Sequence, residues 1–187
     1  GILFFTPFYY IFINSFKSLQ EIYIDPSTLP TSWNFVNFVA GAKAIKLPKL
    51  FWNSTVITAL SIILLNFLGS LSAWKMARKK QRKLFSLMYI LYILSMIVPF
   101  QTVMIPVVVI ASKLKMMNTR YGIIFLNIGF GLPLTFFLYH GFIGTVPKAL
   151  EESARIDGAS ENRVFFSIVF PLLTPITTTI AILNLLW

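Results

Sequence analysis

The sequence contains no cysteine, so the chain can form no disulfide bond and offers no thiol for redox or nucleophilic chemistry. It has one histidine, His140, and six acidic residues, which leave no plausible cluster of metal ligands. No GxxxxGK[ST] loop occurs, so we expect the chain itself not to bind ATP. No span or loop offers a nucleophile beside a base, and this argues against a membrane enzyme.

Charge is also scarce. Charged residues make up 12% of the chain and hydrophobic residues 57%, whereas an ordinary soluble domain carries about 25% charged residues. A soluble fold of this composition would expose too much apolar surface. Every charged residue falls in one of four patches, 17–49, 75–83, 113–120 and 148–163. This pattern predicts an integral membrane protein.

Five uncharged stretches separate or flank these patches, at 1–16, 50–74, 84–112, 121–147 and 164–187. The last four run 24 to 29 residues, and a spanning helix needs about 20. Because unpaired backbone groups are costly in lipid, each crossing is predicted to be helical. We therefore expect an all-α membrane protein with four whole spans and a partial one at 1–16. The stretch 1–16 lacks the basic start of a signal peptide.

Two features interrupt this simple pattern. Pro99 and Pro106 lie inside the third apolar stretch and remove helix hydrogen bonds. We expect one crossing up to about Pro99, then a bent or partly re-entrant continuation at the outer face. The connection 17–49 is expected to be polar and irregular, because Pro26, Pro30 and Pro48 break regular structure.

The orientation follows from the basic residues. The loop 75–83 holds six positive charges and no negative one, which places it in the cytoplasm by the positive-inside rule. The loop 148–163 then lies on the same side. In this orientation Lys113, Lys115 and Arg120 lie outside, which counts against it. The cluster at 75–83 has the higher density of positive charge and decides the assignment. The net charge of +10 is expected to face lipid headgroups rather than nucleic acid.

No acidic residue or lysine lies inside a predicted span. Ion-coupled carriers usually place such groups in the bilayer, although sodium can be held by carbonyls and hydroxyls alone. If the protein moves a solute uphill, we expect the energy to come from another subunit. A channel or a secondary carrier remains the alternative of a different class.

The loop 147–163 is the most informative segment. Pro147 suits the first turn of a helix, Glu151 and Glu152 suit its positive end, and Gly158 suits its left-handed stop. We expect a helix over 148–156, about 13 Å long, with Leu150 and Ala154 on one face. The residues alone leave two interpretations open. The helix either simply connects two spans, or it is a projecting element on which a partner protein docks.

The segment resembles the EAA motif of the permease subunits of binding-protein-dependent ABC importers. That motif reads Glu-Ala-Ala, three residues, Gly, nine residues, Ile, one residue, Leu-Pro. Here the corresponding residues are Glu152-Ser153-Ala154, Gly158, Ile168 and Phe170-Pro171. The departures are Ser153 for Ala and Phe170 for Leu.

The resemblance extends over nearly all 187 residues. Further matches to the carbohydrate branch of the family, and within it to the maltose-type second permease, are Asn53-Ser54, Pro99-Phe100-Gln101 with Ile105-Pro106, Met117-Asn118-Thr119 and Val146-Pro147-Lys148. The resemblance implies a single type-1 permease domain over 1–187 with a MetI-like helix bundle, about five of six spans being present and both ends clipped. It also implies sugar import; a permease of the same superfamily for another solute is the alternative.

The resemblance further implies partners and site residues. The partners are a second permease subunit, a cytoplasmic ATPase dimer that binds ATP and Mg, and an extracytoplasmic solute-binding protein. In the family, the motif forms a coupling helix that docks on the ATPase. The expected coupling residues are Glu151, Glu152, Ser153, Ala154, Asp157, Gly158 and Ala159, with Glu152 as the anchor.

Polar residues inside the spans are candidates for lining the translocation path, because a sugar site needs hydroxyl and amide groups and aromatic faces. The same residue types also hold spanning helices together. The candidates are Asn66, Tyr92, Ser95, Gln101, Asn127 and Thr178.

Overall fold

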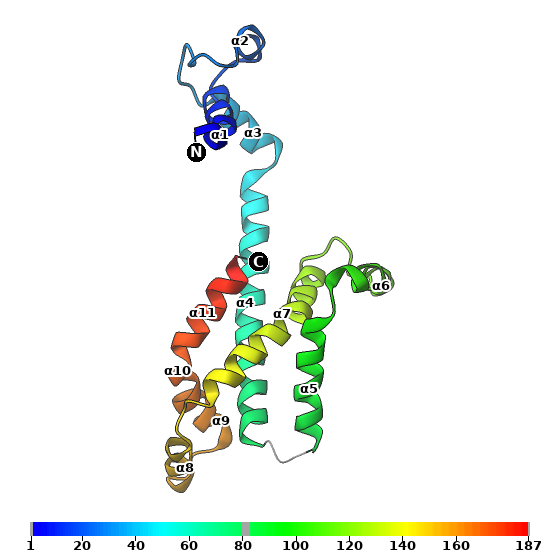
Figure 1. Cartoon of the computed structure of the whole chain (residues 1–187), viewed down its shortest axis with the longest axis vertical. Helices are drawn as coiled ribbons and strands as arrows, with labels where there is room; N and C mark the ends of the chain where they lie inside the picture. The colour runs from blue at the N-terminus through cyan, green and yellow to red at the C-terminus, as the bar shows by residue number, and fades with distance from the viewer. Residues whose placement is uncertain (1, 80–82, 187) are drawn as a thin grey trace. The chain divides into compact units, whose positions relative to one another are not determined.

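The structure is a computed structural model that describes residues 2–79 and 83–186 (Figure 1). Residues 80–82 of the basic loop lie outside the described residues. The described residues form helices and connecting loops, with no strand among them. The elements are α1 (Ile2–Asn14), α2 (Leu19–Ile24), α3 (Val36–Ala44), α4 (Leu47–Arg78), α5 (Lys83–Ile97), α6 (Phe100–Lys113), α7 (Arg120–Ile143), α8 (Lys148–Ile156), α9 (Glu161–Val164), the π-helix η1 (Phe165–Val169), α10 (Phe170–Leu172) and α11 (Thr174–Leu185).

The chain divides into two compact units, residues 1–54 and 55–187. The first unit holds α1, α2 and α3, and the second holds α5 to α11. Helix α4 begins in the first unit and continues through the second. The single domain over 1–187 stays a prediction.

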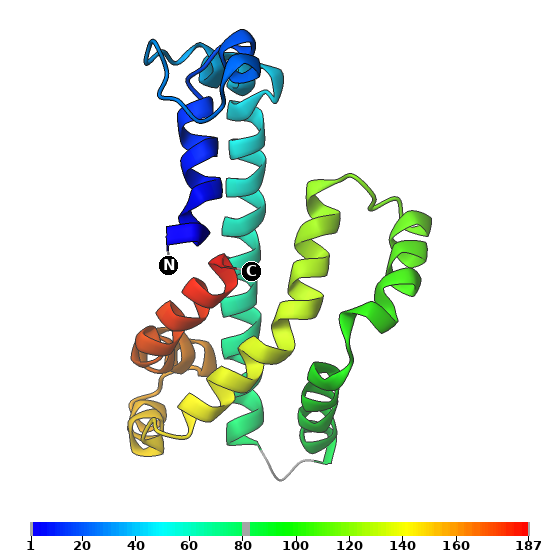
Figure 2. The same cartoon turned by 45° about the horizontal axis from the view of Figure 1, so that its top comes forward.

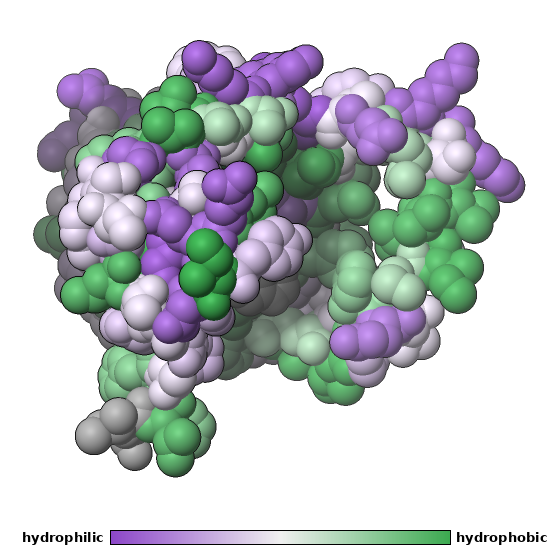
Figure 3. Space-filling model, turned by 90° about the horizontal axis from the view of Figure 1, so that it is seen from above, coloured by the Kyte–Doolittle hydropathy of each residue, from purple (hydrophilic) through white to green (hydrophobic). Residues whose placement is uncertain are grey.

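The first unit is organised around the buried side chain of Lys17, whose ammonium group donates to the backbone oxygen of Asp25 at 3.0 Å. Phe16 packs beside it against four aromatic rings at centroid distances of 5.0 to 5.6 Å. Hydrophilic and hydrophobic side chains are mixed on the face of this unit that Figure 3 shows. Such an amphipathic, aromatic-rich surface suits a membrane–water boundary.

The expectation of an irregular connection over 17–49 was wrong in part. The segment contains α2, whose Ser18 forms a capping box with Glu21, and the separate helix α3. Pro48 lies in the first turn of α4 rather than in a loop. A proline is compatible with a first turn because the backbone N–H that it lacks would have no partner there.

The structure contains two to four candidate spans. Helices α4 and α7 are each long and apolar enough to cross a membrane. Two bent pairs pass the same test, α5 with α6 at 104°, and Glu161–Leu172 with α11 at 73° (Figure 2). Counting each bent pair as one span makes four, and α1 is a shorter apolar helix. The all-α membrane fold is therefore confirmed.

The bend between α5 and α6 lies at the predicted proline. Pro99 is the N-cap of α6, and the residue before a proline avoids the helical conformation. The other bend, at Leu173, was not predicted. Pro171 cannot donate a backbone hydrogen bond and crowds the carbonyl group four residues earlier. The chain accommodates it with the π-helix η1, in which Phe170 N–H donates to Phe165 O.

In the second unit α7 crosses α4 (Figures 1 and 2), and the apolar core takes residues from both helices and from the segment 164–180. It contains the fully buried rings of Trp74, Phe136 and Tyr139. Gly69 of α4 permits the close approach, since a β-carbon there would lie 2.5 Å from Thr135 Cγ2 of α7. By contrast, a β-carbon on Gly129 would meet nothing within 4 Å.

These two glycines form a matched pair for a test of the crossing. Gly69→Ala should destabilise the purified chain by about 1–3 kcal/mol, because the added methyl group overpacks the contact. Gly129→Ala should change stability by no more than about 0.5 kcal/mol. Equal unfolding midpoints of the two variants in a detergent titration would show that the crossing is not tightly packed.

Candidate functional site

The predicted helix of the loop 147–163 is α8, with the predicted bounds Lys148–Ile156. Pro147 is its N-cap, and Glu151 lies in its first turn, where a carboxylate interacts favourably with the helix dipole. At the other end, Gly158 has φ +82° and Ala159 N–H donates to Ala154 O at 2.9 Å. This is the Schellman arrangement that a left-handed glycine permits.

Helix α8 has one face turned into the chain and one turned out. Glu151 and Ala154 are buried, and they lie three residues apart on the inner face. Leu150 was expected to share a face with Ala154, but Leu150 is 44% exposed. Glu151 is tolerated on the inner face because its carboxylate finds partners there, as described next.

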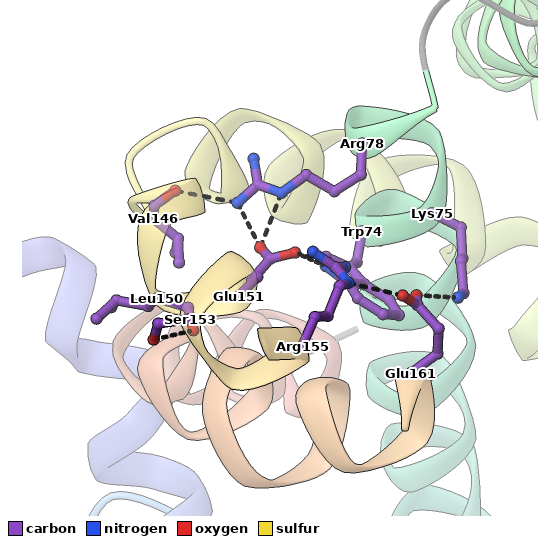
Figure 4. Close-up of polar contacts among 9 residues, drawn as sticks. All are labelled: Trp74, Lys75, Arg78, Val146, Leu150, Glu151, Ser153, Arg155 and Glu161. Carbon is purple, nitrogen blue, oxygen red and sulfur yellow. Dashed lines mark hydrogen bonds and ion pairs between the residues drawn. The ribbon is translucent and has the colours of Figure 1, made fainter. Parts of the chain in front are cut away.

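The Glu151 carboxylate is 1% exposed and accepts hydrogen bonds on both oxygens (Figure 4). Nε and Nη2 of Arg78 lie 2.8 and 2.7 Å from Oε1. The indole nitrogen of Trp74 donates to Oε2 at 3.1 Å, and Arg155 Nη2 lies 3.4 Å from the same oxygen. Arg78 also donates to the backbone oxygen of Val146 at 3.0 Å. We call Glu151, Arg78 and Trp74 the buried clamp.

The clamp joins segments that are far apart in sequence, since Glu151 lies 73 residues after Arg78. A buried charge is tolerated only when it is paired and its hydrogen-bonding capacity is filled. Both conditions hold for Glu151, and the side chain of Arg78 is itself only 13% exposed. The end of α4 and the start of α8 are therefore held together by a specific, directional contact.

A second, more exposed group of charges lies beside the clamp. Glu161 of α9 accepts from Arg155 Nε at 2.8 Å and from Lys75 Nζ at 3.1 Å. The hydrogen bond to Glu161 raises the pKa of Arg155 above its ordinary value. Exposed pairs of this kind contribute little to stability individually. They do show that the basic end of α4 and the loop after α7 lie together.

The seven predicted coupling residues divide between the two faces of α8 and its C-terminal turn. Glu151 and Ala154 contact the chain's own interior, so neither offers its side chain to a partner. Glu152, Ser153, Asp157 and Gly158 are exposed, and Ala159 is half-buried.

Sequence reasoning missed three important residues. Ile156 is 85% exposed on the outer side of α8, and Arg78 and Trp74 are the partners of Glu151. A signal for Arg78 was present, because the basic loop and the acidic loop were both assigned to the cytoplasm and their charges are complementary. Nothing in the sequence pattern identified which of the basic residues would pair with Glu151.

The predicted path residues fall into separate groups. Asn66 accepts a hydrogen bond from Tyr139 OH at 2.7 Å, and the same hydroxyl lies 2.8 Å from Thr177 Oγ1. Asn127 donates to Ser61 Oγ at 3.2 Å. These pairs connect α4 with α7, and α7 with α11. A pocket of about 220 Å³, which we call the polar pocket, lies at the Asn127–Ser61 pair. It is lined by Thr58, Ser61, Leu65, Asn127, Asn184 and Leu185.

The other predicted path residues are not brought to this pocket. Tyr92 and Ser95 line a different pocket between α5 and α7, where the Tyr92 ring stacks on Phe136 at 4.3 Å. Gln101 is exposed on α6. Thr178 is exposed on α11, and its hydroxyl donates to Thr174 O of the same helix.

The clamp predicts a strong local effect of one substitution. Arg78→Met leaves the Glu151 carboxylate buried without its main counter-charge, which should destabilise the 146–161 segment by about 3–5 kcal/mol. Hydrogen exchange of the α8 amides should accelerate accordingly.

The control for this experiment is Glu161→Gln, which breaks only the exposed pairs and should cost no more than about 1 kcal/mol. If Arg78→Met left α8 as protected as Glu161→Gln does, the clamp would not be what holds α8 in place.

Comparison with known proteins identifies the family of the chain. Residues 65–187 match the family model described as binding-protein-dependent transport system inner membrane component. Over 187 residues, the chain is 38% identical to the probable starch degradation products transport system permease protein AmyC of Thermoanaerobacterium thermosulfurigenes, covering all of this chain and 68% of that protein.

Two further relatives are similar. The melibiose/raffinose/stachyose import permease protein MelC of Bacillus subtilis is 41% identical over 181 residues, which are 96% of this chain and 65% of that protein. The multiple sugar-binding transport system permease protein MsmG of Streptococcus mutans is 38% identical over 195 aligned residues, with 100% and 68% covered. The chain thus spans about two thirds of the length of these relatives.

These matches confirm the resemblance inferred from the EAA motif, including its carbohydrate branch. They also confirm a multi-pass inner-membrane location and a non-enzymatic role as a permease subunit. The chain belongs to the family of binding-protein-dependent transport system inner membrane components.

Proposed function

We propose that this chain is a membrane-spanning subunit of an ATP-driven sugar importer and that α8 is its coupling helix. Relatives named for starch products, for melibiose, raffinose and stachyose, and for multiple sugars support the sugar assignment. The observation that carries the coupling role is the two-sided character of α8. Its inner face is anchored in the chain by the clamp, while its outer face has no covering element among the described residues.

The outer face has the properties of a docking surface. Ala149, Glu152, Ser153 and Ile156 are all exposed, and their spacing places them in one stripe along α8. Ile156 supplies an apolar side chain and Glu152 a carboxylate, a combination suited to a cleft in a protein partner. We assign this stripe to the ATPase, with Glu152 as the polar anchor and Ile156 as an apolar anchor.

The partners follow from this assignment. The ATPase dimer would bind ATP and Mg, the second permease would complete the membrane path, and an extracytoplasmic binding protein would deliver the sugar. No bond is made or broken in this chain. Closure of the ATPase would displace α8, and the difference in binding free energy between inward- and outward-open states would drive the switch.

The polar pocket is our candidate for part of the translocation path. Its Ser, Thr and Asn side chains offer hydroxyl and amide groups from α4, α7 and α11, which are the donors and acceptors that sugar hydroxyls need. Of the predicted path residues, Asn127 lines this pocket, whereas Asn66 is bonded to Tyr139 and does not line it.

The coupling role is tested by Glu152→Lys in the complete transporter, reconstituted in proteoliposomes with its binding protein. Radiolabelled melibiose, raffinose and maltotriose are screened, and a sugar that the wild type accumulates is used. The variant should fold and insert normally, because Glu152 is exposed, but its ATPase should no longer co-purify and uptake should fall at least about tenfold, the effect of 1.4 kcal/mol.

The matched control is Arg163→Glu, a charge reversal at an exposed position of α9 that lies outside the outer stripe of α8. It should retain uptake. Equal uptake by the wild type and Glu152→Lys would remove Glu152 from the mechanism.

A further inference from the structure

We propose that the buried clamp transmits the coupling motion of α8 to the cytoplasmic end of α4. Glu151 and Arg78 are the positioning residues that link these two helices. This inference rests on the proposed function of α8. Chain connectivity alone would pass a displacement of α8 to α7 before it and to α9 and α11 after it. The clamp adds a fourth helix, α4, that is remote in sequence.

The first argument is the number of attachment points. Within little more than one turn of α4, Trp74 and Arg78 contact Glu151, Arg78 contacts the Val146 carbonyl, and Lys75 contacts Glu161. These partners lie before, within and after α8. The segment 146–161 is thus attached to the last turn of α4 at three positions, so the two should move as one body.

The second argument is that moving α8 away from α4 would be energetically costly. If α8 moved without α4, the Glu151 carboxylate would lose its partners inside the protein, and an unpaired buried charge is strongly unfavourable. The ring of Trp74 is also fully buried and packs against Phe165 at a centroid distance of 5.2 Å. Ala154 of α8 and Ala73 of α4 belong to the same apolar core. Polar contacts therefore join α4 to α8, and an apolar contact joins α4 to η1, which follows α8 in the chain.

The third argument is where α4 leads. Its residue Ser61 bonds to Asn127 of α7 at the polar pocket, and Asn66 bonds to Tyr139 of the same helix. Arg78 lies 17 residues from Ser61 on one unbroken helix, a distance of about 25 Å at 1.5 Å per residue. A displacement of the clamped end would thus reach the pocket through a continuous helix, whereas the route through α9 and α11 crosses the π-helix and the 73° bend.

The experiment compares Glu151→Gln with wild type in the same proteoliposomes, and it measures ATP hydrolysed per sugar imported. The outer stripe of α8 is intact in this variant, so the ATPase should still co-purify in wild-type amounts. Uptake should fall at least tenfold and ATP consumed per sugar should rise at least fivefold. A role limited to holding the fold together would instead lower ATPase co-purification and uptake in parallel.

A second variant guards against misfolding. In Glu151→Gln with Arg78→Gln, no charge of the pair is left unpartnered, so this double variant should accumulate even if the single one does not. Because the two residues act as one unit, the double variant should lose no more coupling than the single one. A strictly additive loss would contradict the clamp.

The absence of native cysteine allows a rescue. Glu151→Cys with Arg78→Cys, combined with cysteine-free partner subunits, should be uncoupled as purified. A short bifunctional methanethiosulfonate should restore uptake by relinking α4 to α8, and a reductant should abolish it again. Failure of the reagent to restore uptake in a complex that is demonstrably crosslinked would overturn the proposal.

The outcomes separate this inference from the proposed function. If Glu152→Lys transports normally, α8 is not the coupling helix and the proposed function fails. If Glu152→Lys loses transport while Glu151→Gln keeps the wild-type ratio of ATP to sugar, α8 couples without α4 and only the present inference fails.

Discussion

The second unit depends on one physical constraint, the burial of a carboxylate next to a membrane bundle. Glu151 is tolerated inside because Arg78 and Trp74 fill its hydrogen-bonding capacity. That requirement determines which face of α8 turns inward and which end of α4 it meets. The opposite face of α8 is left open as a consequence. One buried charge pair thereby holds the nine-residue helix α8 in place on its inner face and leaves its outer face exposed.

The membrane imposes the other constraint on the fold. In lipid, the backbone N–H and C=O groups must form hydrogen bonds within the protein, and helices provide these bonds. Prolines then decide where spans bend. At Pro99 the chain breaks between two α-helices, whereas at Pro171 it first widens into a π-helix and bends two residues later. In both cases the break lies in an apolar segment.

The polar side chains of the bundle serve two purposes. Tyr139 joins Asn66 and Thr177, which connects α7 with α4 and α11. Asn127 and Ser61 form a bond beside an accessible pocket. The same chemistry that holds helices together in lipid can therefore line a path for a hydroxyl-rich solute. Thr178, predicted from its residue type alone, lies on the exposed side of its helix and bonds within its own turn.

The sequence by itself determined the class, the helical spans, the bend at Pro99 and the bounds of α8. These properties follow from local composition and from short-range rules for prolines, glycines and helix ends. The EAA spacing also sufficed to indicate the family. Only the tertiary structure decided that Glu151 faces inward and Glu152 outward, that Arg78 is the partner, and that Ile156 is exposed. Those outcomes depend on contacts between residues more than 70 positions apart, which no local pattern encodes.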